Sequence, residues 1–107
     1  MKLIYAIVSD DDTSVVSRQL SKNGYYATKL ASTGSFLMSG NTTFMICTED
    51  EKVEKAIDII KQNSKKRKQV VPSADTYSLG SYSLFPVEVT VGGATIFVTN
   101  VEHFEKV

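Results

Sequence analysis

The hydrophobic pattern of the chain opens with an almost unbroken apolar run over residues 2–8, bounded by a serine and three aspartates. Such a run predicts a strand near the centre of a sheet. The aspartates at 10–12 are candidate caps for a following helix, because a helix N-terminus favours negative charge. Apolar residues at helical spacing and a closing Asn-Gly pair predict that this helix covers residues 12–22.

Two further strands and a second helix are predicted in the middle of the chain. Residues 25–31 alternate between apolar and polar side chains, and residues 42–48 are rich in threonine and apolar residues, so we expect one strand in each. The clearest helical pattern lies around residues 53–60, where apolar residues recur at positions i, i+3, i+4 and i+7. Thr48 and Asp50 are candidate caps for this helix.

The remaining chain combines an irregular segment with a predicted hairpin. Residues 62–84 have no periodicity and contain a proline, a glycine and many serines, which predicts one long loop. Residues 85–91 and 94–98 then alternate as two strands, and the Gly92-Gly93 pair between them is typical of a two-residue hairpin turn.

This order of elements predicts a single α+β domain over residues 1–107, a ferredoxin-like (βαββαβ) sandwich with an additional C-terminal strand. Both helices would lie on one face of an antiparallel sheet. The strands nevertheless place apolar side chains on both sides, so we expect other copies of the chain to cover the second face. These side chains are Leu30, Phe44, Met45, Ile46, Val87, Val89, Ile96 and Phe97.

Length, charge and cysteine content narrow the class of protein. The 107 residues are enough for one core, and 12 basic against 12 acidic residues give no general attraction for nucleic acid. The first apolar run is far shorter than the ~18 residues of a membrane span, so no membrane insertion is expected. Cys47 is the single cysteine, which excludes an internal disulfide and fits a cytoplasmic protein.

Groups that could catalyse a reaction are sparse. His103 is the only histidine and is best explained as a surface residue. The aspartates at 10–12 could bind Mg²⁺, but helix capping explains them without a metal. Cys47 has no neighbouring cation in the sequence and is expected to pack as a small side chain. We therefore expect neither an enzyme nor a metal site.

A basic run at residues 65–68 directly follows the second predicted helix. Charges at a helix C-terminus interact well with the helix dipole and stay solvated, although attraction of a phosphate is the alternative. An RNA-recognition module would need aromatic residues in a defined pattern on its central strands, and residues 2–8 and 42–48 do not supply it. DNA and RNA are therefore not expected partners.

The connector over residues 32–41 is the strongest candidate for a ligand site. Its glycines and serines permit close approach of the backbone to phosphate oxygens, and Thr28 and Asn41 beside it offer neutral hydrogen bonds. Phe36 and Leu37 would provide an apolar wall for a planar base. The alternative, that these two side chains only fill the core, stays open.

The segments "ATKLASTGSFLMSGNTTFMI" and "PVEVTVGGATIFV" resemble the PII-like cyclic di-AMP receptors, small cytoplasmic signalling proteins of Gram-positive bacteria. The resemblance covers nearly the whole chain. It implies a non-catalytic PII-like homotrimer of ferredoxin-like subunits, with one cyclic di-AMP bound in each cleft between neighbouring subunits. It also implies that the ligand reorders the 62–84 loop and so alters contact with an unidentified downstream protein.

The resemblance assigns ligand contacts by position. Thr28 and Asn41 would contact phosphate or base, Phe36 and Leu37 would line the adenine pocket, and Phe97 would present its ring to a base. Gly40 would leave room for the ligand. The full set is Tyr26, Thr28, Ser35, Phe36, Leu37, Gly40, Asn41, Cys47 and Phe97.

Two positions depart from the family pattern. Tyr26 stands where relatives often have an arginine, and Cys47 stands where a glycine is usual. The first change removes a cationic contact, and the second narrows the space beside the ligand. A PII-like sensor of another adenine nucleotide such as ATP is therefore the alternative hypothesis, and a small trimeric enzyme with its site in the same cleft is the third.

Overall fold

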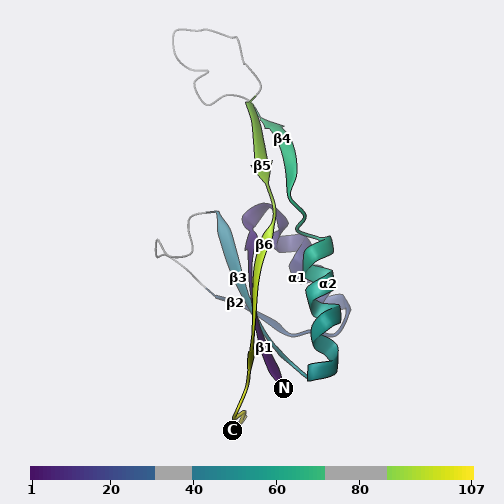
Figure 1. Ribbon diagram of the computed structural model, residues 1–107, viewed down its shortest axis with the longest axis vertical. Coiled ribbons are helices and arrows are strands. Elements are labelled where there is room, and N and C mark those ends of the chain that lie inside the picture. Colours follow the sequence, from purple (N-terminus) through teal and green to yellow (C-terminus); the bar gives the residue numbers. More distant parts are fainter. Residues whose placement is uncertain (31–39, 72–86) are drawn as a thin grey trace.

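The computed structural model describes residues 1–30, 40–71 and 87–107, and its main body is a four-stranded sheet with two helices on one face (Figure 1). The spatial order of the strands is β2-β3-β1-β6, and each neighbouring pair is antiparallel. This order agrees with a ferredoxin-like fold, so the predicted α+β class and the central position of the first strand are confirmed. The strands are β1 (Lys2–Ser9), β2 (Ala27–Leu30), β3 (Asn41–Thr48) and β6 (Ala94–Asn100).

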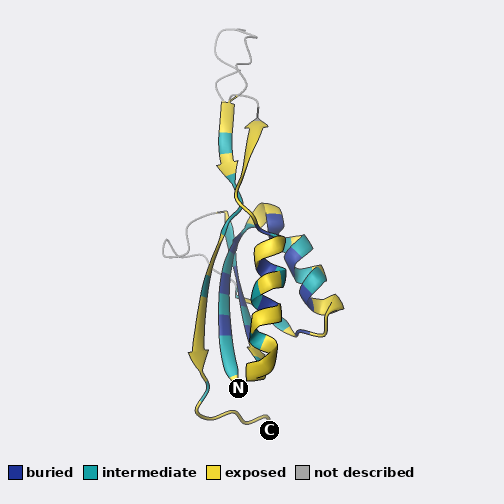
Figure 2. Ribbon diagram, turned by 45° about the vertical axis from the view of Figure 1, so that its right-hand side comes forward, coloured by how far each residue is buried: buried dark blue, intermediate teal, exposed yellow. Residues whose placement is uncertain are grey.

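Each helix of the domain begins with a short 3₁₀ turn. The turn η1 (Asp10–Asp12) leads into α1 (Thr13–Lys22), and the turn η3 (Asp50–Lys52) leads into α2 (Val53–Gln62). Both helices were predicted from apolar residues at helical spacing, and the buried ones face the sheet (Figure 2).

The core lies between this helical layer and one face of the sheet (Figure 2). Alternation along β1 sends Ile4, Ala6 and Val8 into it, and each is fully buried. The register with β3 places Ile46 opposite Ile4 and Phe44 opposite Ala6. Burying one Ile, Val or Phe side chain stabilises the fold by about 1.5–3 kcal/mol. The other core residues are Val16, Leu20, Tyr25, Ala56 and Ile60.

The aspartates before α1 do not cap this helix as predicted. Ser9 caps η1, because its hydroxyl accepts a hydrogen bond from the Asp11 N–H at 3.3 Å. Asp12 occupies the position before α1 but makes no side-chain cap bond. Its carboxylate is paired with Arg67 on a distant part of the chain, and that partner could not be seen from local sequence.

The predicted caps of α2 are also wrong. Glu49 and Lys52 occupy the positions before η3 and α2, and neither makes a side-chain cap bond. Asp50 instead accepts a contact from the α-amino group of Met1, with 2.6 Å between nitrogen and oxygen. The helix therefore depends on its packed face rather than on a cap.

The segment after α2 differs from the predicted single loop. Arg67–Val71 forms β4, which pairs antiparallel with β5 (Val87–Val91) in a separate two-stranded sheet. We call β4 and β5 the arm, which extends beyond one end of the main sheet (Figure 1). The loop prediction over 62–84 is therefore wrong at the residues of β4, because their pairing partner is distant in sequence. The rest of that loop after Val71 lies outside the described residues.

The predicted hairpin at Gly92-Gly93 is wrong as well. β5 pairs with β4 while β6 pairs with β1, so the last strand is the fourth strand of the main sheet and not an additional one. Gly92 and Gly93 have φ angles of 88° and 86°. A Cβ atom at Gly92 would lie 2.5 Å from the carbonyl oxygen of Lys65. The two glycines thus connect the arm to the main sheet at a point where the neighbouring residues leave no space for a side chain.

The sheet face opposite the helices, which we call the open face, has no covering layer among the described residues. The register places Tyr5 of β1 between Met45 of β3 and Phe97 of β6 on this face. Phe97 is 54% exposed, and most of β6 is exposed with it (Figure 2). The predicted apolar character of both sheet faces is confirmed for these strands. Val87 and Val89 belong to the arm instead.

Candidate functional site

A hollow of about 440 Å³ lies on the open face, beside the C-terminal tail. We call it the open-face hollow. Leu3 is opposite Cys47 in the register, and Thr28 is opposite Met45, so alternation turns these side chains to the same face. Tyr26 completes this side of the hollow, so Tyr26, Thr28 and Cys47, three predicted ligand contacts, lie together. The full lining is Leu3, Tyr26, Thr28, Met45, Cys47, Phe104 and Lys106.

The lining of the open-face hollow combines aromatic rings, neutral polar groups and one cation. Tyr26 is 91% exposed and Phe104 is 59% exposed, so both rings are accessible for stacking on a base. Lys106 is the charged member of the lining and would attract a phosphate. The free thiol of Cys47 is exposed, so the expectation that it packs as a small side chain is wrong.

Sequence reasoning missed the contribution of the C-terminal tail. Phe104 and Lys106 lie in a segment without periodicity, and they join the hollow only because the tail crosses near β1 and β3. Leu3 and Met45 read as ordinary strand residues. Only the register of the sheet shows that these side chains share a face with Thr28.

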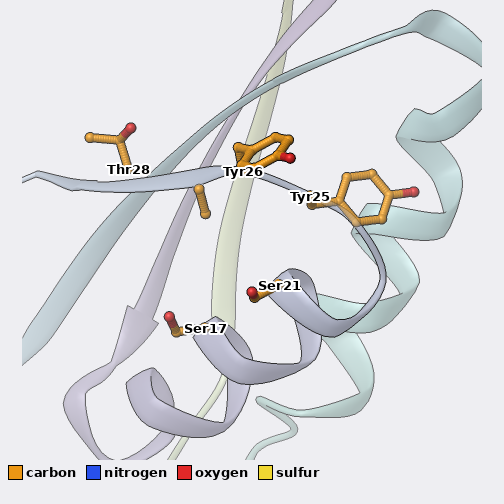
Figure 3. A pocket seen from close by; sticks show the side chains of 6 residues that line it. Ser17, Ser21, Tyr25, Tyr26 and Thr28 are labelled. Carbon is orange, nitrogen blue, oxygen red and sulfur yellow. The ribbon is translucent and has the colours of Figure 1, made fainter.

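A second hollow, of about 250 Å³, lies between α1 and β2 and shares Tyr26 and Thr28 with the first (Figure 3). Figure 3 shows Ser17 and Ser21 on the helix side, Tyr26 just before β2 and Thr28 within it. Tyr25 is buried and donates its hydroxyl to the carbonyl of Lys52 at 2.8 Å. Burial raises the pKa of the Tyr25 phenol. Tyr25 therefore anchors the start of β2, which leaves its neighbour Tyr26 at the surface.

Asn41 and Gly40 lie at another place, next to the arm. A hollow of about 250 Å³, which we call the root hollow, contains Asn41 together with Lys66 and the Gly92-Gly93 pair. Gly40 has a φ of 93°, and its carbonyl accepts a hydrogen bond from the Asp10 N–H at 2.7 Å. The full lining of the root hollow is Ile7, Asn41, Lys66, Gly92, Gly93, Ala94 and Thr95.

One chain does not bring all the predicted contacts to one point. Asn41 begins β3 and Cys47 lies near its end, so the two are about 20 Å apart along the strand. Phe97 lies opposite Tyr5, outside the linings of all three hollows. Ser35, Phe36 and Leu37 lie outside the described residues.

The remaining candidates for chemistry are held in structural contacts. Asp10 accepts a hydrogen bond from the Thr42 hydroxyl at 2.7 Å. The exposed His103 contacts Glu105 at 3.1 Å. In the basic run, Lys68 lies in β4 rather than at the helix end and pairs with Glu88 across the arm at 3.2 Å, but its side chain stays exposed, as predicted for a solvated charge.

Residues 1–30, 40–71 and 87–107 offer neither a clustered metal site nor a membrane-spanning helix. No group of three or more His, Cys, Asp or Glu side chains in these ranges could hold a metal ion. No helix in the same part of the chain has the length and apolar character needed to cross a membrane.

Comparisons with known proteins agree with the resemblance seen in the loop and the last strands. A family model described as "Cyclic-di-AMP receptor" matches residues 1–107. Among solved structures, a functionally unknown protein from Pediococcus pentosaceus ATCC 25745 is similar, with a TM-score of 0.77 and 42% sequence identity over 99% of this chain and 96% of that chain. The chain therefore belongs to the cyclic di-AMP receptor family.

Proposed function

We propose that this protein is a cytoplasmic signalling receptor that binds cyclic di-AMP in the clefts between subunits of a PII-like homotrimer and catalyses no reaction. The open-face hollow is the observation that supports this function best. It brings Tyr26, Thr28 and Cys47 together in a chain of a receptor family for this nucleotide.

The chemistry of the open-face hollow suits part of the ligand. Cyclic di-AMP has two adenine bases and two phosphates. Tyr26 and Phe104 offer faces for a base, the Thr28 hydroxyl offers a hydrogen bond, and Lys106 offers a positive charge. The volume of about 440 Å³ is within the usual range of about 300–1,000 Å³ for small-molecule sites.

A second subunit would complete the site. Phe97 and Phe104 are large apolar side chains that stay more than half exposed in one chain. Asn41 lies about 20 Å from Cys47 along β3. In the proposed trimer the open faces of three subunits would meet and cover Phe97, and the Asn41 end of one subunit would lie beside the open-face hollow of the next.

The signal would pass to a downstream protein through the segment after α2. A ligand that binds one conformation of that segment more tightly would increase its population, and this would change the surface that the downstream protein contacts. We therefore propose that cyclic di-AMP reorders residues 62–84, including β4.

Calorimetric titration of the purified protein with cyclic di-AMP, ATP and cyclic di-GMP tests the function. We expect saturable heat with cyclic di-AMP and weaker or no heat with the other two. Lys106→Ala and Thr28→Val should weaken binding, since each removes a polar group of the hollow. Lys55→Ala, which removes an exposed lysine of α2 outside both the hollow and the segment after α2, is the matched control and should bind as the unmodified protein does.

The alternative ligand is ATP. Tyr26 lines the open-face hollow where the family resemblance implies an arginine, so one cationic contact to a phosphate is missing. Tighter binding of ATP than of cyclic di-AMP would establish this alternative. Absence of heat with all three nucleotides would contradict both hypotheses, and turnover of a candidate substrate would then favour the enzyme.

A further inference from the structure

The turn η1 connects two parts of the molecule that are distant in sequence. Its first residue, Asp10, holds the start of β3 through two hydrogen bonds. The Asp10 N–H donates to the carbonyl of Gly40 at 2.7 Å, and the Asp10 carboxylate accepts from the Thr42 hydroxyl at 2.7 Å. Asp10 thus fixes both neighbours of Asn41, a predicted ligand contact.

The last residue of η1, Asp12, holds the start of the arm. Its carboxylate accepts from both terminal nitrogens of the Arg67 guanidinium, at 2.8 Å and 3.3 Å. Asp12 is only 5% exposed. Hydrogen bonding to Asp12 raises the pKa of Arg67, so the guanidinium stays charged. A buried carboxylate without such a partner would be costly, so Arg67 is strongly held in place.

The second strand of the arm is fixed at the same point. The Gly93 N–H donates to the carbonyl of Ser64 at 2.5 Å, where α2 has just ended. Arg67 also donates to the carbonyl of Lys65 at 3.2 Å. A Cβ atom at Gly92 would lie only 2.8 Å from the Arg67 guanidinium, so the glycine leaves the space that this side chain occupies.

The two elements that η1 contacts, the start of β3 and the base of the arm, also face each other across the root hollow. Asn41 from the start of β3 lines it together with Lys66, Gly92 and Gly93 from the base of the arm. A displacement of β3 at Asn41 would therefore shift the arm both across this hollow and through η1. The turn is only three residues long, so very little chain separates its contact with β3 from its contact with the arm.

We propose that η1 is a coupling element in which Asp10 and Asp12 link the position of Asn41 to the position of the arm. Asp12 and Arg67 are positioning residues in this role. The inference rests on the proposed function where it names cyclic di-AMP as the molecule that displaces Asn41. The link between β3 and the arm does not depend on that ligand.

Amide hydrogen exchange without nucleotide tests the link. Arg67→Gln should speed exchange in β4 and β5 by about tenfold relative to β1, because the guanidinium no longer holds the arm. Lys68→Gln, which removes the exposed pair with Glu88 further along the arm, should leave that ratio unchanged. Equal acceleration in β1 and the arm, or none in the arm, would overturn the positioning role.

Thr42→Val is the decisive variant, because Thr42 contacts Asp10 and belongs to β3. We expect it to speed exchange in the arm relative to β1, and to do so less when Arg67→Gln is already present. If Arg67→Gln fails to fold, Arg67→Lys provides a milder disturbance of the same contact, because it keeps the positive charge but loses the paired hydrogen bonds to Asp12. Unchanged exchange of the arm in Thr42→Val would overturn the coupling.

A last measurement separates this inference from the proposed function. Saturating cyclic di-AMP should alter exchange in the arm of the unmodified protein and alter it less in Thr42→Val. Calorimetric binding without any change in the arm would refute the coupling and leave the receptor function standing. Lack of calorimetric binding would refute the receptor function, while the nucleotide-free comparison would still decide the link through η1.

Discussion

Tyr5 of β1 lies directly opposite Phe97 of β6, on the sheet face that neither helix covers. Met45 of β3 lies opposite Tyr5 on its other side, so three large side chains form a row across three strands. Phe97 stays 54% exposed within the chain. A row of this kind on an uncovered sheet is typical of a surface that packs against another protein chain.

Phe97→Asp should dissociate the proposed trimer into monomers that keep the fold. A carboxylate in the middle of an apolar interface would lose its hydration without gaining a partner. Size-exclusion chromatography with light scattering measures the mass. Val70→Asp, at a side chain of the arm that is 64% exposed, is the control and should stay trimeric. Unmodified protein that runs as a monomer would refute the trimer itself.

Tyr26→Arg should increase the affinity for cyclic di-AMP by about tenfold, since a guanidinium can pair with a phosphate in the open-face hollow. Calorimetry of the variant beside the unmodified protein gives the ratio. Gln62→Arg adds the same charge at the exposed end of α2 and should change little. An equal gain in both variants would show long-range attraction instead of a contact at position 26.

Cys47 gives a direct probe of the open-face hollow, because it is the single cysteine of the chain and its thiol is exposed. A disulfide reagent such as dithionitrobenzoate should modify one thiol per chain. Saturating cyclic di-AMP should slow this reaction, since a bound ligand would cover the sulfur. The Cys47→Ser variant, which has no thiol, should release none of the coloured nitrothiobenzoate product. A rate that is unchanged by bound ligand would place the ligand elsewhere.

The contact between the Met1 amino group and Asp50 should make stability depend on pH at both ends of the range. The hydrogen bond raises the pKa of the amino group above 8.0 and lowers the pKa of Asp50 below 3.8. The contact therefore stabilises the fold fully between pH 3.8 and pH 8.0, the ordinary pKa values of the two groups. It is lost as pH rises through the raised pKa of the amine, and also as pH falls through the lowered pKa of Asp50.

Thermal unfolding of unmodified and N-terminally acetylated protein measures this contribution. Acetylation should lower Tm near neutral pH, and the difference should disappear in strong alkali and in strong acid. The effect should be small and weaken with salt, because both groups are at the surface. In Asp50→Asn, acetylation should change Tm little at any pH. A difference that persists in strong alkali would rule out the ion pair as its cause.

Thr43→Val should raise the free energy of unfolding by about 1 kcal/mol. Thr43 is 4% exposed, and its hydroxyl has no hydrogen-bond partner among the described residues. Valine has the same shape without the unsatisfied group. Urea denaturation measures the change, and Thr42→Val should act in the opposite direction because its hydroxyl donates to Asp10. A loss of stability in Thr43→Val would show that this hydroxyl has a partner in solution.

The main sheet and its helices could be predicted from the sequence because they depend on local patterns. The apolar run of β1 and the helical spacing in α2 are examples. The arm could not be predicted, since β4 reads as the end of a basic run and its partner β5 is distant in sequence. Gly92-Gly93 was misread because two glycines favour positive φ but do not determine which strands will pair.

The candidate site was predictable only in part, for a related reason. Thr28 was named from its hydrogen-bonding group, Tyr26 and Cys47 were named from a family resemblance, and the fold brings the three together. Phe104 and Lys106 join them through tertiary packing that leaves no periodic signal. The partners of Asp12 and Asp10 were invisible for the same reason, so a local cap was the simpler interpretation.

Ser64 connects the end of α2 with the entry into β6. Its side chain is buried, its hydroxyl donates to the carbonyl of Ile60, and its own carbonyl accepts from Gly93. The contacts that complete the main domain are thus made before the chain enters β4 and after it leaves β5. Shorter or longer inserts, or a grafted reporter peptide, are therefore expected to be tolerated between Arg67 and Gly92, where they leave both the hydrophobic interior and the Asp12 contact intact.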